Sequence, residues 1–264
     1  MLNKLLKYDL KYMIKNMSIF YILSIFFAIT TRILFGLEQS IIIKIIGQIS
    51  VGFMFSMVAS TLINTIMRSW VRFRDSLYKD ESYLTHTLPV TKNDLYNSKF
   101  IQTLIFYFIS FIVILISLFI TYYTKENWTG ITDFIKNITT GLNMSTIFFI
   151  TMFIIVVFLE IFNAIQCGFL GIIIGHRFNS NKILYSVLFG FIAYLVAQTL
   201  ILTLIFIFGL FDPSIMELFK TGTISIDVNA FKTLALLSTI LYLFIIGTMR
   251  FICIKLLNKG VNVE

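Results

Sequence analysis

One carboxylate interrupts an apolar stretch that extends from residue 145 to residue 175. The carboxylate belongs to Glu160, and a bare carboxylate at the centre of a bilayer costs several kcal/mol. We therefore expect Glu160 to face the interior of a helix bundle and to be paired or protonated. Two roles are open to it: a part in a transport pathway, or a hydrogen bond to a neighbouring helix.

Small and polar residues accompany Glu160 on the same predicted helix. Asn163 and Gln166 add polar side chains to the sector of the helix next to that of Glu160. The face of Glu160 continues as small residues, which let another helix approach closely, at Ala164, Cys167, Gly171 and Gly175. A second small and polar ridge, with residues four apart, consists of Gly52, Ser56, Ser60 and Asn64. This second ridge is typical either of a helix that packs against a second copy of the chain or of one that lines a transport path.

Motifs for several chemistries are absent from the sequence. No G-x-x-x-x-G-K-[ST] phosphate loop occurs, so the chain cannot bind and hydrolyse ATP by that mechanism. The only histidines, His86 and His176, form no H-E-x-x-H pattern. Cys167 and Cys253 lie far apart and form no C-x-x-C pair. We expect no catalytic residue, no metal site and no cofactor in this chain, and no enzymatic activity of its own.

The elements that must position these residues are membrane-spanning helices. Of 264 residues, 58% are hydrophobic and 13% are charged, which leaves more apolar surface than a soluble domain could hide. A spanning helix needs roughly 20 apolar residues. Windows of this kind occur at 17–37, 45–67, 100–123, 145–175, 183–211 and 233–254. The sequence therefore predicts an all-α membrane protein with six transmembrane helices in one domain, 1–264.

The basic residues are distributed unevenly between the connecting segments. With the N-terminus inside, 15 of the 21 Lys and Arg residues fall on the cytoplasmic side and five on the outer side. The cytoplasmic segments are then 1–16, 68–99, 176–182 and 250–264. This positive-inside bias predicts that both ends face the cytoplasm. Because topology accounts for the net charge of +8, we expect no nucleic-acid partner.

Residues 1–16 predict an amphipathic helix at the cytoplasmic membrane surface. On a helical wheel one narrow sector is basic, with Lys4, Lys7, Lys11 and Lys15, and the opposite side is rich in leucine. Such a helix lies in the interface with its lysines toward anionic lipid headgroups. It could be a topology anchor or an elbow helix that embraces the bundle. Asp9 projects from the apolar side, which suggests a protein partner there.

The cytoplasmic segment 68–99 has the most informative pattern. Its apolar residues recur at helical spacing, with charges of both signs around them, at Trp70, Phe73, Leu77 and Leu84. Pro89 ends this predicted helix, and Thr91 with Asp94 forms a capping pattern that starts a new helix at Lys92. Aromatic residues among mixed charges are typical of a docking surface. A solvated loop that touches lipid would share the composition.

Residues 75–100, DSLYKDESYLTHTLPVTKNDLYNSKF, resemble the signature of bacterial ABC-transporter permease subunits of the type-2 (ABC-2-like) exporter class. In that class an acidic and aromatic stretch with leucine precedes an LPV-type turn and a Ser-Lys pair that leads into the third span. The matching positions are Asp80, Glu81, Tyr83, Leu84, Thr87, Leu88, Pro89, Ser98 and Lys99. The start LLKYDLK and the six-span layout also agree, whereas Ser82 stands where many members have Gly.

The resemblance implies a coupling helix within residues 70–84 that contacts a separate cytoplasmic ATP-binding subunit. The implied contact residues are Arg72, Phe73, Asp75, Leu77, Tyr78, Lys79, Asp80, Glu81, Tyr83 and Leu84. That subunit, not this chain, would bind ATP and Mg²⁺. The resemblance also implies a second permease, either another copy or a similar chain, in the lipid of the bacterial inner membrane. The near-absence of charge in the spans fits an apolar or amphipathic cargo, such as an antimicrobial peptide or a drug.

Two other functions agree with the same sequence. A stand-alone secondary transporter or channel would use Glu160, although coupling ions usually require more intramembrane carboxylates or broken helices. A membrane anchor or sensor for a cytoplasmic partner would keep the docking segment without needing the polar ridges. Charge reversal at Asp80 and Glu81 would abolish ATPase binding in the exporter and leave a secondary transporter nearly unchanged.

Overall fold

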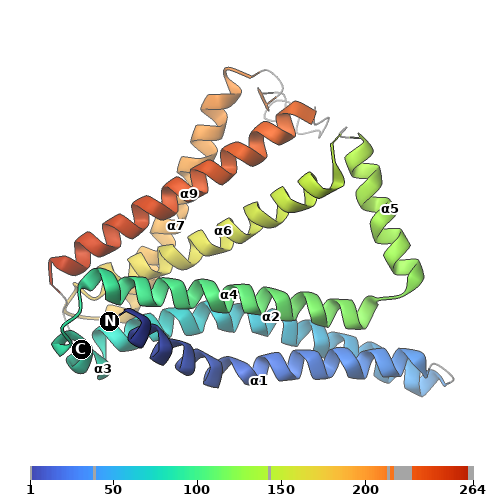
Figure 1. Ribbon diagram of the computed structural model, residues 1–264, viewed down its shortest axis with the longest axis horizontal. Coiled ribbons are helices and arrows are strands. Elements are labelled where there is room, and N and C mark those ends of the chain that lie inside the picture. Colours follow the sequence, from blue (N-terminus) through green and yellow to red (C-terminus); the bar gives the residue numbers. More distant parts are fainter. Residues whose placement is uncertain (1, 38–39, 142–143, 213–214, 217–227, 261–264) are drawn as a thin grey trace. The chain divides into compact units, whose positions relative to one another are not determined.

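The computed structural model describes residues 2–37, 40–141, 144–212, 215–216 and 228–260 (Figure 1). Within these ranges the regular secondary structure is α-helical and comprises eight helices. Six of them are long and apolar enough to cross a bilayer. These are α1 (Leu2–Gly36), α2 (Ile41–Tyr78), α4 (Lys92–Tyr122), α6 (Thr146–Gly175), α7 (Lys182–Gly209) and α9 (Val228–Asn258). The prediction of an all-α chain with six candidate spans is confirmed, and such helices indicate a multi-pass membrane protein.

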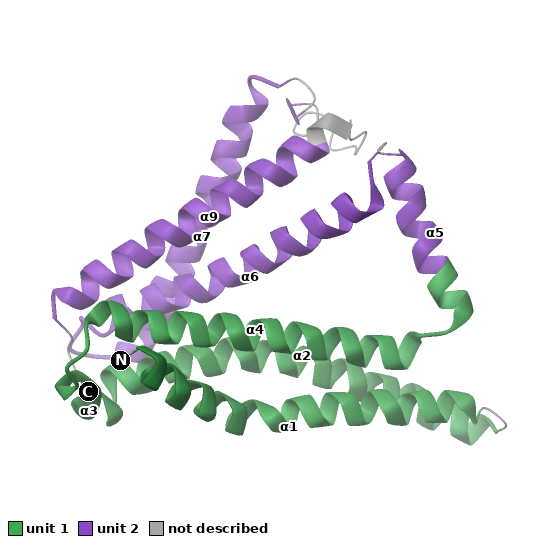
Figure 2. Cartoon of the chain, in the orientation of Figure 1, with its two compact units in different colours: residues 1–129, 264 green, residues 130–263 purple. Residues whose placement is uncertain are grey.

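The chain divides into two compact units, residues 1–129 and residues 130–263 (Figure 2). Unit 1 contains α1, α2, α4 and the short α3 (Glu81–Thr87), and unit 2 contains α6, α7 and α9. The helix α5 (Lys125–Gly141) begins in unit 1 and ends in unit 2. Each unit therefore holds three of the six candidate spans. The expectation of a single membrane domain stays a prediction.

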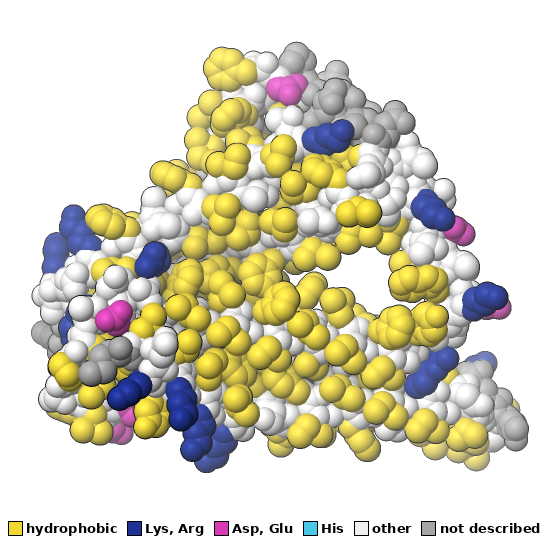
Figure 3. All heavy atoms as spheres, in the orientation of Figure 1, with side chains coloured by type: hydrophobic (Ala, Val, Ile, Leu, Met, Phe, Trp, Pro, Cys, Tyr) yellow, Lys and Arg dark blue, Asp and Glu magenta, His cyan; other side chains and the backbone are white. Residues whose placement is uncertain are grey.

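Large apolar side chains are exposed along all six long helices. Figure 3 shows hydrophobic side chains over most of the visible face of these helices. Ile22 and Phe26 of α1 and Leu243 and Phe244 of α9 are more than half exposed. Exposed apolar surface on this scale is unfavourable in water and is what lipid tails would cover.

Hydroxyl groups join the three long helices of unit 1. The side-chain oxygen of Ser110 on α4 lies 2.8 Å from that of Tyr21 on α1 and 2.6 Å from that of Thr65 on α2. Two further hydroxyl pairs join α1 to α4 and α2, at 3.2 Å and 2.8 Å respectively: Ser24 with Ser117, and Thr31 with Ser50. Apolar side chains gain little by leaving lipid for one another, so these hydrogen bonds help to specify how the helices pack.

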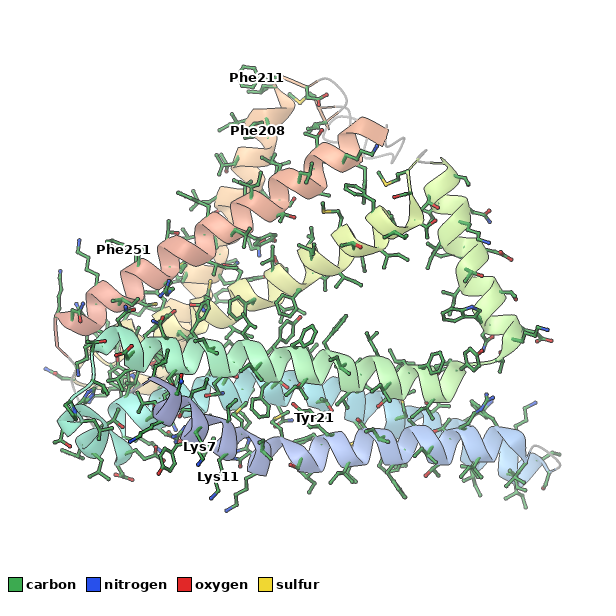
Figure 4. All side chains as sticks on the ribbon, viewed as in Figure 1. Lys7, Lys11, Tyr21, Phe208, Phe211 and Phe251 are labelled. Carbon is green, nitrogen blue, oxygen red and sulfur yellow. The ribbon has the colours of Figure 1, made fainter. Side chains whose placement is uncertain are left out.

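The first helix, α1, is continuous from Leu2 to Gly36. The predicted interfacial helix, 1–16, is thus not shown as a separate element, and no Gly or Pro occurs before Gly36 to interrupt α1. The lysines of this part are exposed, and Figure 4 shows Lys7 and Lys11 pointing away from α2 and α4.

The opposite side of the same part of α1 packs against protein. Met13 and Met17 are fully buried and form a cluster with Phe106 of α4. The apolar side of the predicted amphipathic helix therefore contacts the chain's own third long helix. Amphipathic patterning shows that one side is buried, but it does not distinguish lipid from protein as the covering material.

The predicted amphipathic helix between Trp70 and Leu84 is divided between two elements. The second long helix, α2, ends at Tyr78, and Lys79 adopts an extended conformation with φ −98° and ψ −162°. The chain then turns into α3, which begins at Glu81. This break was not predictable from local composition, because the turn at Lys79 and Asp80 contains neither Gly nor Pro.

The start of α4 agrees with the sequence prediction. The helix begins at Lys92, and the hydroxyl of Thr91 accepts a hydrogen bond from the backbone N–H of Asp94 at 3.1 Å. Pro89 lies in the connection between α3, which ends at Thr87, and α4. The predicted cap and the predicted helix start are both confirmed.

In unit 2, glycines bring α6 and α7 close together. A Cβ atom added at Gly171 would lie 2.4 Å from the backbone nitrogen of Gly190 and 2.4 Å from the carbonyl oxygen of Ser186. A Cβ atom added at Gly175 would lie 2.3 Å from the hydroxyl oxygen of Ser186. Separations below 3 Å leave no room for a side chain. The predicted small-residue face of α6 is therefore confirmed as a surface of close helix approach.

Adding a methyl group at Gly171 should push α6 and α7 apart, because the atoms that it meets belong to the backbone of α7. We expect Gly171→Ala to lower the apparent Tm of the purified protein in detergent by about 5 °C, from an overpacking penalty of about 2 kcal/mol. Gly247→Ala on α9 is the control, since nothing lies within 4 Å of a Cβ atom added there. Equal Tm values for the two variants would contradict the close approach.

Candidate functional site

Asp9 is the centre of a buried ionic network in unit 1. Its side chain is only 2% exposed, and its Oδ1 atom accepts a hydrogen bond from Nε of Arg72 at 2.9 Å. The ammonium of Lys99 also donates to Oδ1, and the hydroxyl of Ser98 donates to Oδ2 at 2.5 Å. These residues come from α1, α2 and the start of α4. One carboxylate therefore connects three of the long helices.

Arg72 extends this network to α3. Its Nη1 atom donates to a carboxylate oxygen of Glu81 at 2.6 Å, while its Nε atom donates to Asp9. The guanidinium also lies 4.6 Å from the centre of the Tyr12 ring, which is within the range of a cation–π interaction. We use the name Asp9 network for Asp9, Arg72, Glu81, Ser98 and Lys99. Its two cations balance its two carboxylates, so the network carries no net charge.

The network answers the question that the sequence raised about Asp9. The sequence suggested a protein partner for this carboxylate, and the structure places residues of the same chain beside it. Lys99 is 90 residues away and nearly fully buried, and sequence reasoning noted it only as part of the family signature. The available signal was a carboxylate on an apolar helix face together with a basic residue at the start of a later span.

Burial divides the predicted ATPase-contact residues into three groups. Those that pack inside the chain are Arg72, Phe73, Leu77 and Tyr78. Asp75 and Lys79 are half-buried. Asp75 pairs with Arg74 at 2.9 Å and approaches Lys79 at 4.0 Å. Those exposed are Asp80, Glu81, Tyr83 and Leu84. Among these ten predicted contact residues, only those of α3 and of the turn before it are therefore open to a partner.

A pocket of about 440 Å³ opens beside the Asp9 network. Asp9, Arg72 and Lys99 contribute its polar part, and Tyr8 and Leu84 are among the residues that line it. The charged groups that line the pocket, Asp9, Arg72, Glu81 and Lys99, are already paired with one another. The pocket therefore separates the exposed side of α3 from α1 without presenting an unpaired charge.

His86 links α3 to the end of α2 and to the start of α4. Its Nε2 atom lies 3.0 Å from the carbonyl oxygen of Leu77, and its Nδ1 atom lies 2.6 Å from the ammonium of Lys92. Burial lowers the pKa of His86; the hydrogen bond to Leu77 opposes this effect, and the positive charge of Lys92 adds to it. The neutral ring, with Nε2 donating and Nδ1 accepting, satisfies both contacts.

Acid should loosen the segment that His86 holds. Because its pKa is lowered in the folded protein, the unfolded segment takes up the proton first as the pH falls below about 6.5, and the contribution to stability present above that pH is lost. We expect hydrogen exchange of residues 77–92, corrected for intrinsic rates, to accelerate between pH 7.5 and pH 5.5, values that lie on either side of about 6.5. His86→Gln should remove this acceleration. The same acceleration in His86→Gln would assign the effect to another group.

Glu160 has a different environment in unit 2. Its Oε1 atom accepts hydrogen bonds from the hydroxyl of Tyr194 and from Nε2 of Gln198, each at 2.7 Å. Its Oε2 atom accepts one from the hydroxyl of Tyr242. Tyr194 and Gln198 belong to α7 and Tyr242 to α9, so Glu160 is paired with two neighbouring helices. Sequence reasoning named Glu160 but none of its three donors.

The other predicted polar positions in the spans fall into two classes. Asn163 and Gln166 are fully buried on α6, next to the turn that carries Glu160. On α2, Ser56 is exposed and Ser60 and Asn64 are half-buried. In this part of α2 the buried polar residues lie one position further along, at Thr61, Thr65 and Ser69. Both sets recur every four residues, so spacing alone could not choose between them.

Metal-binding geometry is not found in the described residues: no three His, Cys, Asp or Glu residues come together there as ligands. Comparison of the chain with protein families, with curated proteins and with solved structures found no match. No family is thus identified for the chain, and the resemblance of residues 75–100 to exporter permeases stays a prediction from the sequence.

Removing the charge of Asp9 should destabilise unit 1 strongly, because Arg72 and Lys99 would remain buried beside a neutral group. We expect Asp9→Asn to reduce the free energy of unfolding by about 3 kcal/mol. Denaturant unfolding followed by intrinsic fluorescence would measure it. Asp133→Asn is the control, since Asp133 is exposed on α5. A stability equal to that of the control would show that the network contributes little.

Proposed function

We propose that this chain is the membrane-spanning permease subunit of an ABC exporter, driven by a separate cytoplasmic subunit that binds Mg²⁺ and ATP. The observation that carries the proposal is the Asp9 network. It fastens α3, the element of the family-like motif with an open surface, to α1, α2 and α4. A docking helix that only held a partner in place would not need an ion pair that is linked, through Arg72 and Asp9, to three long helices.

The network provides a physical route for force. Glu81 at the start of α3 pairs with Arg72 near the end of α2, and Arg72 pairs with Asp9 on α1. Asp9 in turn pairs with Lys99 in the first turns of α4. Breaking any of these contacts would leave a buried charged group without one of its partners. The ends of the helices therefore move together more readily than they separate. A displacement of α3 by a partner would thus be passed to α1, α2 and α4.

The outer surface of α3 has the chemistry of a partner interface. Tyr83 is 64% exposed, Leu84 is 74% exposed and Leu88 is 45% exposed. The carboxylates of Asp80 and Glu81 stand at the start of the same helix. Aromatic and aliphatic anchors with flanking charge supply affinity and orientation in protein interfaces. The partner surface that fits is an apolar groove with basic residues at one end.

The remaining parts of the proposal follow from the charge distribution and the spans. The positive-inside bias favours a cytoplasmic position for α3 and for both ends of this chain. The family resemblance implies that the helices lie in the inner membrane of a bacterial cell. A second permease, identical or similar, would complete the translocation path. The cargo would be apolar or amphipathic, as an antimicrobial peptide or a drug is.

A stand-alone secondary transporter is the second candidate, and the hydrogen-bonded Glu160 is the observation that favours it. A membrane anchor for a cytoplasmic partner would explain the exposed surface of α3, but not the ionic network that fastens α3 to the long helices. The anchor would not explain a hydrogen-bonded carboxylate inside the spans, which is costly to maintain without a function.

Affinity purification of the tagged chain from its native membranes tests the proposal. We expect a soluble ATP-hydrolysing subunit to co-purify in near-equal amount. Tyr83→Asp combined with Leu84→Asp should reduce its recovery about tenfold or more, because two exposed anchors of α3 are lost. These positions leave the buried Asp9 network intact.

Asn93→Asp is the matched control, because Asn93 is exposed in the first turn of α4, where an added negative charge is tolerated. It should leave recovery of the ATPase unchanged. Purification of the chain without any ATPase, or undiminished recovery with the double variant, would refute the exporter assignment.

A further inference from the structure

The environment of Glu160 differs from that of Asp9 in the charge of its partners. Asp9 lies beside Arg72 and Lys99, so its negative charge is neutralised within the chain. The three donors that reach Glu160 come from two tyrosines and a glutamine, all of them uncharged. These donors orient the carboxylate without cancelling its charge. A positive charge brought to Glu160 would therefore be attracted more strongly than one brought to Asp9.

The hydrogen-bonding capacity left at Glu160 is almost entirely that of an acceptor. Each carboxylate oxygen has two lone pairs, and Oε2 accepts a single hydrogen bond here, so one position on it remains. Each tyrosine hydroxyl gives its one hydrogen to Glu160 and keeps lone pairs that can accept. A ligand that satisfies these atoms must donate several hydrogen bonds and carry positive charge. An ammonium group, with three donors and no acceptor, meets both conditions.

The surroundings define the rest of such a ligand. Glu160 is the only charged residue in α6, and Lys182 at the start of α7 is the only one in that helix. Tyr242 is buried, but Glu160, Tyr194 and Gln198 are half-buried, so the group is reachable from outside the helices through these three residues. A divalent metal would require more carboxylate or carbonyl oxygens than this single carboxylate offers. A ligand with an apolar chain and one ammonium group would match this site, in which one polar group is surrounded by apolar helix surface.

We propose that Glu160, Tyr194, Gln198 and Tyr242 form a binding site for the primary ammonium group of an amphipathic molecule. The carboxylate supplies the opposite charge, and the phenolic oxygens of Tyr194 and Tyr242 accept the remaining ammonium hydrogens. This inference concerns binding by unit 2 alone, so it holds whether or not an ATP-hydrolysing subunit docks on α3.

Equilibrium binding of radiolabelled octylamine to the full chain in nanodiscs of zwitterionic lipid tests the proposal. Empty nanodiscs give the amount that partitions into lipid. We expect a saturable component of octylamine binding. Octanol should not displace this bound octylamine, because octanol carries no charge. Octyltrimethylammonium should compete about tenfold or more weakly than octylamine, because it has charge but no N–H donor.

Two variants locate the site. Glu160→Gln keeps the shape and removes the charge, and we expect it to weaken octylamine binding about tenfold or more. Tyr194→Phe removes one phenolic oxygen and should weaken binding less, by about threefold; it also serves if Glu160→Gln fails to fold. Thr199→Ala is the control on α7, because Thr199 is exposed and bonds only to its own helix backbone. Its affinity should equal that of the wild type.

Three results would overturn the proposal. The first is the absence of saturable octylamine binding to the wild type. The second is equal affinity for octylamine and octyltrimethylammonium, or full affinity in both Glu160→Gln and Tyr194→Phe. The third is an infrared carboxylic-acid band at neutral pH that disappears in Glu160→Gln and does not respond to octylamine. That band would show that a proton, and not an amine, neutralises Glu160.

Discussion

In a bilayer, helices with apolar outer surfaces gain little by hiding those surfaces from one another, so association depends on polar contacts and on close backbone approach. The two units meet this constraint differently. In unit 1, hydroxyl pairs along α1, α2 and α4 and the Asp9 network join helices that are otherwise apolar. In unit 2, glycines bring α6 against α7, and Glu160 joins both α7 and α9 to α6. Each unit therefore contains one carboxylate that fixes three helices at once.

The two carboxylates show how the same group serves two purposes. A buried charge with cationic partners is a fixed part of the structure, because removing either side leaves an unpaired charge. A charge held by uncharged donors keeps an attraction for cations that enter from elsewhere. Asp9 belongs to the first kind and Glu160 to the second. The donor type, more than the depth of burial, thus separates a carboxylate that holds helices together from one that can also receive a ligand.

Sequence patterns predicted those features that depend on neighbours along the chain. The six apolar helices, the Thr91 cap and the small face of α6 all follow from local composition and spacing. The predictions that failed concern contacts between residues that are not neighbours along the chain. The turn at Lys79 brings Glu81 within hydrogen-bonding distance of Arg72. Asp9 pairs with Lys99, which lies 90 residues further along the chain. On α2 the ridge that includes Ser56 and the ridge that includes Thr65 have the same spacing, and only packing against α1 and α4 decides which is buried.

Arg72 has a place in the Asp9 network that a lysine could not fill. Its guanidinium donates to Asp9 through Nε and to Glu81 through Nη1, two directions fixed by a planar group, and it lies over the ring of Tyr12. A lysine has a single charged atom and could not hold two carboxylates on different helices in the same orientation. Since Glu81 is half exposed while Asp9 is almost completely buried, Arg72 connects the surface of α3 with the interior of unit 1. A partner that moved α3 would therefore act on Asp9, and so on α1 and α4, through this planar group.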